Sequence, residues 1–298
     1  MARQMDRVSI VIPAFNEGEN LVDTVRCILE NTAYPDFEIV VVNDGSTDGS
    51  GDRLSTAVGN DSRVGLVRAE GVGVANARNL GAECASGQIL IFLDAHCYTP
   101  PNWVDGLIQP LADRCVGMVG PSIGNMCCGG DARGWGMMWR GAGLKVEWLG
   151  QRENTAYPVP LLGGACQVVR KANLRRLGYY DAGMTRWGSE DQELCLRYWL
   201  MGYEVLVQPQ TVVYHVFRDS DRCEIQVQKV IYNRLRLALL HLSSERVDRV
   251  LNYYSSIPGF AEIMAWLQRS DVMSLRNQLQ ELRRRDDDWF FSRFGCRI

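Results

Sequence analysis

Long apolar runs and an excess of charge of one sign are both missing from this sequence. No segment approaches roughly 18 uncharged apolar residues, and the apolar stretch near the N-terminus is too short for a signal peptide or a membrane span. The 298 residues carry 32 Lys and Arg against 35 Asp and Glu, a net charge of -3, so no basic field favours a nucleic acid. We expect a soluble globular protein without a transmembrane segment and without a nucleic-acid partner.

A C-x-x-C motif is also missing, although the chain contains ten cysteines. The cysteines are scattered, and several lie in apolar helix or strand patterns, as Cys27, Cys84 and Cys195 do. A zinc ribbon or a disulfide scaffold would need tighter spacing. We therefore predict buried free thiols in a reducing compartment, which places the protein in the cytoplasm.

The first hundred residues alternate apolar strand patterns with helix patterns. We predict strands at 8–12, 38–42, 64–67 and 88–93, with helices at 19–31 and 74–84. Continuous apolar strands separated by helices favour an α/β fold with a mostly parallel central sheet, covered on both faces. Ligands of such sheets gather at the carboxyl ends of the strands, where the polar residues of this chain fall.

The second half of the sequence is less regular. Residues 121–158 are rich in Gly, Trp and Met and show no clear pattern, while 161–170, 204–207 and 212–215 read as strands and 190–201 as a helix. Amphipathic helices follow, with a charge run at 283–288 that we interpret as a solvated helix face. We predict an α/β domain at 1–218 and a helical extension at 219–298, which binds a substrate or mediates homo-oligomerisation.

Two of the only three histidines end strand-like segments. Asp94 and His96 follow the strand QILIFL, and residues two apart in an extended chain point to the same side. His215 ends the run TVVYH, whereas His241 is interpreted as a helix residue. A carboxylate with imidazoles suits Mn²⁺ or another divalent metal. The alternative for Asp94 and His96 is a helix-capping carboxylate beside a surface histidine.

Three further polar groups are candidates for a functional site. Asp44 ends the strand EIVVV, where a carboxylate accepts hydrogen bonds from a base or ribose, or forms a turn before glycine. Arg78 lies in a helix pattern, from which it reaches a nucleotide or remains on the helix surface. Glu190 and Asp191 open a helix, where carboxylates either complement the helix dipole or deprotonate an incoming hydroxyl.

The motifs VSIVIPAFNE, VVNDGSTDGS, the Asp94 segment and Trp187–Asp191 occur together in one order. In this order and spacing the sequence resembles glycosyltransferase family 2, with the nucleotide-sugar-binding GT-A fold, over about residues 6–218. Four segments are also similar to motifs of the polypeptide N-acetylgalactosaminyltransferases. These are the Asp-x-His pair, Leu162-Gly163-Gly164, LGYYDAGMTRWGSEDQELCLRYW and YHVFR.

The resemblance implies a role for each of these residues. Asp94, His96 and His215 would bind Mn²⁺ or Mg²⁺, which bridges the two phosphates of a UDP-sugar. Asp44 and Arg78 would contact uracil and ribose. The residues expected near them are Pro13, Ala14, Asn16 and Glu17. Around the sugar, Gly163 and Gly164 would leave room for it and Glu190 would hydrogen-bond it. Trp187 would close over the donor or face the acceptor.

We therefore expect a metal-dependent transferase that moves a hexose or N-acetylhexosamine from a UDP-sugar to a hydroxyl on a peptide, a glycan or a small molecule. The N-acetylgalactosaminyltransferases have Asn where this chain has Asp191, and an Asp there is the general base of inverting members of family 2. We predict inversion with Asp191 as the base, with retention as the alternative. A non-catalytic sugar-nucleotide-binding scaffold is another interpretation. A sugar nucleotidyltransferase would carry G-x-G-T-R-L where this chain has PAFNEGEN.

Overall fold

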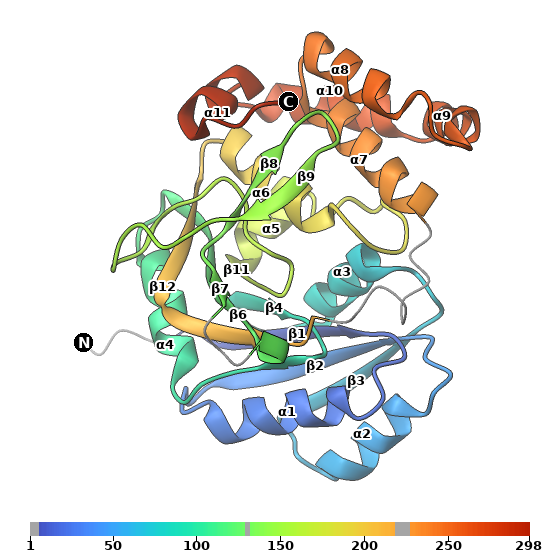
Figure 1. Cartoon of the computed structure of the whole chain (residues 1–298). Helices are drawn as coiled ribbons and strands as arrows, with labels where there is room; N and C mark the ends of the chain where they lie inside the picture. The colour runs from blue at the N-terminus through green and yellow to red at the C-terminus, as the bar shows by residue number, and fades with distance from the viewer. Residues whose placement is uncertain (1–5, 129–131, 218–226) are drawn as a thin grey trace.

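The chain folds around one large mixed sheet. A computed structural model describes residues 6–128, 132–217 and 227–298. Within them the strands of the main sheet follow the order β10-β12-β6-β11-β4-β1-β2-β3, with β5 beside β12 and β7 beside β6 (Figure 1). These strands are β1 (Val8–Ala14), β2 (Phe37–Asp44), β3 (Val64–Ala69), β4 (Ile89–Leu93), β5 (Cys97–Tyr98), β6 (Val116–Asn125), β7 (Arg133–Gly134), β10 (Tyr157–Pro158), β11 (Cys166–Arg170) and β12 (Glu204–His215).

Strand direction divides the sheet into two parts. The first four strands pair in parallel, as their continuous apolar runs predict, because helices cover both faces. In the second part β6 and β12 are parallel, but β11 is antiparallel to both β4 and β6. The sheet is therefore mixed beyond its first four strands. The predicted strands at 204–207 and 212–215 are one strand, β12, with a register shift between Gln208 and Val212.

Helices cover both faces of the sheet. One face packs against α1 (Asn20–Asn31), α2 (Ser50–Val58) and α4 (Trp103–Ile108), and the other against α3 (Val74–Cys84), α5 (Lys171–Leu177) and α6 (Glu190–Leu200). Strand β1 shows how the sequence supplies both cores, since Ile10 and Ile12 join the first cluster and Val11 joins the second. The sequence pattern did not predict α2.

The C-terminal part is helical, as predicted, and packs on the α6 side of the sheet (Figure 1). It comprises α7 (Val227–His241), α8 (Ser244–Tyr254), α9 (Phe260–Arg269), α10 (Val272–Leu282) and α11 (Asp287–Phe294). A hairpin of β8 (Met137–Arg140) and β9 (Lys145–Trp148), within the stretch that had no clear pattern, reaches these helices, where the Tyr254 hydroxyl donates to the Gly143 carbonyl at 2.6 Å.

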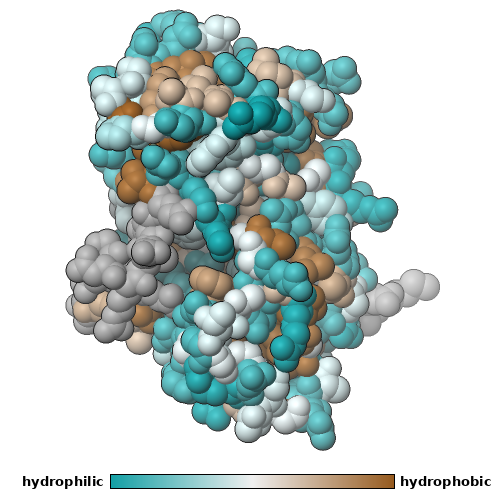
Figure 2. All heavy atoms as spheres, turned by 90° about the vertical axis from the view of Figure 1, so that its right-hand side faces the viewer, coloured by the Kyte–Doolittle hydropathy of each residue, from teal (hydrophilic) through white to brown (hydrophobic). Residues whose placement is uncertain are grey.

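The surface is mixed in polarity, and the cysteines agree only partly with the prediction of buried thiols. In Figure 2 hydrophobic residues form separate patches among hydrophilic ones on the face shown. No helix of the described residues has the length and apolar character needed to cross a bilayer. Cys195 is a buried free thiol, as predicted, whereas Cys84 is exposed on α3.

Candidate active site

Asp94, His96 and His215 converge at one edge of the sheet. Asp94 follows β4, His96 precedes β5, and His215 ends β12, which pairs with β5 so that His215 lies opposite Cys97. One potential ligand atom from each of the three side chains lies within 4.8 Å of the others. Nε2 of His215 is 3.6 Å from Oδ2 of Asp94, and the two imidazole centroids are 4.6 Å apart. The strand ends therefore bring the predicted ligand set together.

The protonation and hydrogen bonding of these groups fit a divalent cation. Burial alone would raise the pKa of Asp94, but its contact with His215 and the charge of Arg78 outweigh burial and hold that pKa well below its usual range. Burial lowers the pKa of His96, which keeps the imidazole neutral. Nδ1 of His96 lies 3.1 Å from Oε2 of Glu17, a contact that fixes the orientation of the imidazole ring. Nδ1 of His215 is buried and has no hydrogen-bond partner among the described residues.

Arg78 occupies the centre of the site. Although it belongs to a helix, its side chain is only 2% exposed. Its Nη1 donates to Oε1 of Glu190 at 2.8 Å, and its Nη2 donates to Oδ1 of Asp94 at 2.8 Å and to the carbonyl of Gly164 at 2.9 Å. The guanidinium thus connects the candidate metal ligand with the first turn of α6, and all these contacts are with protein groups.

Glu190 and Asp191 are both fixed at the N-terminus of α6. Oε2 of Glu190 accepts from the Gly188 amide at 2.9 Å. The Asp191 carboxylate accepts from the amides of Gly164 at 2.9 Å and Gln192 at 2.8 Å. Burial, assisted by the negative charge of Glu190, raises the pKa of Asp191 to about 7. A carboxylate with such a pKa is a stronger base than an ordinary aspartate and still ionises near neutral pH.

The paired glycines allow the close approach of these groups. A Cβ on Gly164 would lie 3.2 Å from Nη2 of Arg78 and 3.3 Å from Oδ2 of Asp191, so a larger residue would press on both side chains. A Cβ on Gly163 would lie 2.9 Å from the ring of Trp148. Both glycines are therefore packed against protein groups of the site, and Trp148 is a neighbour that the sequence patterns did not identify.

Asp44 and Asn16 organise the loops at the carboxyl ends of β1 and β2. The Asp44 carboxylate accepts from the amides of Val72 at 2.7 Å and Gly73 at 2.8 Å, and so holds the loop before α3. The Asn16 side chain accepts from the Thr47 amide at 2.8 Å. Pro13 and Ala14 are the buried last residues of β1. These residues lie where the sequence placed them, at the edge that carries Asp94.

Asn233 on α7 holds the loop that leads to Asp191, a role that the sequence patterns did not indicate. Its Nδ2 donates to the carbonyls of Thr185 and Gly188, both at 2.8 Å, and its Oδ1 accepts from the Thr185 amide at 2.8 Å. Arg186 and Ser189 have φ of 45° and 71° in this loop, a conformation that costs non-glycine residues free energy and needs support from the surroundings. A buried Asn on the apolar face of a helix was the available signal.

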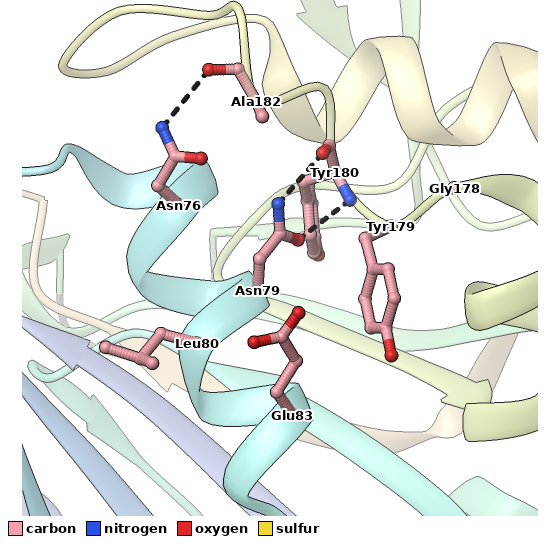
Figure 3. Close-up of a pocket in the computed structure, with 8 residues that line it drawn as sticks. All are labelled: Asn76, Asn79, Leu80, Glu83, Gly178, Tyr179, Tyr180 and Ala182. Atoms are coloured by element: carbon pink, nitrogen blue, oxygen red, sulfur yellow. Dashed lines mark hydrogen bonds between the residues drawn. The ribbon is translucent and has the colours of Figure 1, made fainter.

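A second contact holds the segment that precedes this loop. Asn79 of α3 donates to the Tyr180 carbonyl at 2.9 Å and accepts from the Tyr180 amide at 2.9 Å, and Asn76 donates to the Ala182 carbonyl at 3.2 Å (Figure 3). These residues line a cavity of about 360 Å³. Helix α3 therefore positions both Arg78 and the chain entering the Trp187 loop, whose Trp187 side chain is 58% exposed.

Comparison with known sequences gives a consistent result. Residues 9–178 match the family model described as glycosyl transferase family 2. The human polypeptide N-acetylgalactosaminyltransferase 16 is 31% identical over 231 residues, which cover 70% of this chain and 40% of that protein. The polypeptide N-acetylgalactosaminyltransferase 12 of Mus musculus is 31% identical over 260 residues, 78% of this chain and 43% of its own length. The chain thus spans less than half the length of these curated relatives.

Solved structures share the fold. A crystal structure of GalNAc-T7 with UDP, GalNAc and Mn²⁺ has a TM-score of 0.81 at 22% identity, covering 98% of this chain and 57% of that one. The mannosyltransferase PcManGT from Pyrobaculum calidifontis, in complex with GDP-Man and Mn²⁺, has a TM-score of 0.56 at 18% identity, covering 93% of this chain and 74% of that one. The α/β architecture is the GT-A fold predicted from the sequence. Because the family match extends over more than half of the residues, the chain belongs to glycosyltransferase family 2.

Proposed function

We propose that this protein transfers N-acetylgalactosamine from UDP-N-acetylgalactosamine to a hydroxyl of a peptide. The observation that carries the proposal is the convergence of Asp94, His96 and His215 at a site that Arg78 connects to Gly164, whose amide binds Asp191. A transferase needs charge stabilisation of the leaving group and a base close together. The choice of sugar and acceptor is supported by the relatives, which are named polypeptide N-acetylgalactosaminyltransferases.

Asp94, His96 and His215 would hold Mn²⁺ or Mg²⁺ with one oxygen and two nitrogen ligands. Once bound, the ion supplies positive charge that stabilises the departing diphosphate of UDP. Glu17 keeps the His96 ring oriented through Nδ1, and Arg78 holds the Asp94 carboxylate through Oδ1. Asp44 would accept a hydrogen bond from the nucleoside, in addition to the two amides that it already contacts.

Asp191 would act as the general base. Both of its oxygens are held by backbone amides, which fix the carboxylate without adding an opposing side-chain charge. Its raised pKa allows it to take the proton of an acceptor hydroxyl as the oxygen attacks the anomeric carbon. Attack from the face opposite the leaving UDP inverts the anomeric centre. Glu190, held by Arg78 and the Gly188 amide, would hydrogen-bond the sugar.

The anomeric configuration of the product tests this mechanism. The protein is incubated with UDP-N-acetylgalactosamine, MnCl₂ and a threonine peptide, and the product is analysed by proton NMR. A β-linked product supports inversion, and an α-linked product would assign retention, the alternative predicted from the sequence.

A companion variant tests the base itself. In Asp191→Asn we expect turnover to fall by about 10²- to 10⁴-fold, the usual contribution of general-base catalysis, with UDP binding unchanged. The matched control is Asp248→Asn, at an exposed aspartate of α8. Full turnover in Asp191→Asn would exclude Asp191 as the base.

A further inference from the structure

A cavity of about 470 Å³ lies beside the loop that carries Trp187. Lys145 of β9, Trp187, Arg234 of α7 and Tyr253 and Tyr254 of α8 contribute to its wall. The remaining lining residues are aliphatic and come from α7 and the segment after α8. No lining residue is acidic, although the chain as a whole carries a net charge of -3.

The two cations of this wall have no carboxylate partner among the described residues. Glu147, which follows Lys145 on the same strand, is paired with Arg140. Arg234 is half-buried, and its Nη1 donates to the Tyr254 hydroxyl at 3.0 Å. Two positive charges beside an aliphatic surface, without a counter-ion in the described part of the chain, favour the binding of an anion.

The geometry of Arg234 favours a carboxylate. Nη1 donates to the Tyr254 hydroxyl, and Nε is buried without an acceptor among the described residues, so Nη2 is the donor left for an occupant of the cavity. A hydrogen bond from a guanidinium to a carboxylate is charge-assisted, and therefore stronger than one to a neutral acceptor. Lys145 is exposed on β9 and adds a flexible positive charge at the same wall.

The aromatic residues give the cavity a surface for the chain that bears the carboxylate. Trp187 is 58% exposed and Tyr253 is 47% exposed, so two large rings face solvent beside the cations. The carbonyl of Trp187 is held by Asn233 at 3.3 Å, which links the cavity wall to the loop that enters α6 and Asp191. An occupant of the cavity therefore lies next to the loop that leads to the proposed base.

We propose that this cavity binds an acidic side chain of the peptide acceptor, close to the glycosylated serine or threonine. The inference rests on the proposed function in one respect, since it takes the acceptor to be a peptide. It adds a specificity determinant, with Arg234 as the main contact of the carboxylate and Lys145 as a second positive charge.

Direct binding tests this inference without requiring turnover. The probes are fluorescein-labelled Ala/Gly peptides with one central Thr and a single Glu placed at each of the three positions on either side, with matched Gln peptides. Affinity for the full chain in the presence of UDP and MnCl₂ is measured by fluorescence anisotropy. We expect one or two Glu positions to bind about tenfold or more tightly than their Gln counterparts, as a charge-assisted hydrogen bond provides.

Variants locate the effect in the cavity. Arg234→Gln should abolish the Glu preference and leave the affinity for Gln peptides within about twofold, whereas Arg234→Lys should retain part of the preference. Lys145→Gln should reduce it less, because Lys145 is exposed. The matched control is Arg249→Gln on α8, where the arginine is exposed and paired with Glu245. Thermal unfolding of each variant verifies that it folds. If Arg234→Gln does not fold, Lys145→Gln provides an independent test, because Lys145 is at an exposed position.

Three results would overturn the inference. The first is an equal affinity for the Glu and Gln peptides at every position. The second is a Glu preference that persists in Arg234→Gln. The third is tight binding of a phosphoserine peptide while the Glu and Gln peptides bind with equal affinity. Sugar transfer is scored separately on the same peptides. Transfer without a Glu preference rejects the cavity assignment alone, and a Glu preference lost in Arg234→Gln without any transfer supports the cavity while rejecting the proposed transferase activity.

Discussion

Arg78 donates to Asp94 through Nη2 and to Glu190 through Nη1, each at 2.8 Å, from a position that is 1% exposed. A single buried guanidinium is therefore the shared partner of a candidate metal ligand and of the first residue of α6, and it offsets part of their combined negative charge. Buried carboxylates that lose their only arginine are strongly destabilising, because an uncompensated charge remains in the interior.

Replacement of Arg78 should therefore unfold the protein more easily. We expect Arg78→Met to lower the free energy of unfolding by about 3–5 kcal/mol, measured by urea denaturation. Arg26→Met, at an exposed position of α1, is the matched control and should stay within about 0.5 kcal/mol of the wild type. A loss below about 1 kcal/mol for Arg78→Met would contradict the central role given to this side chain.

Loss of a candidate metal ligand should remove metal-dependent nucleotide binding. With UDP at about 100 times its Kd and saturating MnCl₂, a gain of about 2.7 kcal/mol should raise the melting temperature of the wild type by roughly 5 °C or more. We expect this rise to disappear in Asp94→Asn. Asp52→Asn, at an exposed aspartate of α2, should keep it. An unchanged Mn²⁺-dependent rise in Asp94→Asn would reject the assignment of this site.

The transfer rate should depend on pH through Asp191. Its carboxyl pKa is raised to about 7, and only the ionised form is a base, so the rate should be high above pH 7 and fall tenfold per pH unit well below it. Removing the like charge in Glu190→Gln should shift the midpoint to lower pH, whatever its effect on the absolute rate. A rate–pH profile from pH 5 to 9 measures both midpoints, and a profile flat across this range would speak against a base with this pKa.

Loosening the Asn233 contacts should affect catalysis more than donor binding. Asn233→Ala removes the hydrogen bonds to residues 185 and 188, so we expect kcat to fall about tenfold or more through misplacement of the loop, with little change in the KM of the sugar donor. Hydrogen exchange of the amides of 185–188 should accelerate in parallel. Equal exchange rates in the wild type and the variant would mean that other contacts hold the loop.

The first half of the fold was predictable because each of its buried strands is a local apolar run. Residues 121–158 were not, since β8 is buried by parts of the chain that come much later, as Trp139 is by Phe290 and Phe291 of α11, a contact that no local pattern reports. The interpretation of 283–288 as a solvated helix face was wrong. Arg283 donates to the carbonyls of Leu240 and His241, Asp286 caps α11 by accepting from the Trp289 amide, and Asp287 is buried.

The candidate site was predictable where it depends on strand ends. Asp94, His96 and His215 each adjoin a strand terminus, and the termini of neighbouring strands meet at one edge. Arg78 was not resolved between a nucleotide contact and a surface residue, because a helix pattern does not show that two carboxylates will surround one of its side chains. Asn233 was missed for the same reason, since its partners are backbone groups.

The pairing of β5 with β12 has a consequence for the order of folding. Asp94 and His96 lie in the part of the chain that the family match covers, but His215 arrives only with β12, from the later part of the sequence. Contacts between distant segments form slowly, because the intervening chain must first be ordered. High-affinity Mn²⁺ capture during refolding should therefore appear late, as a reporter that the second half of the sheet has closed onto the first.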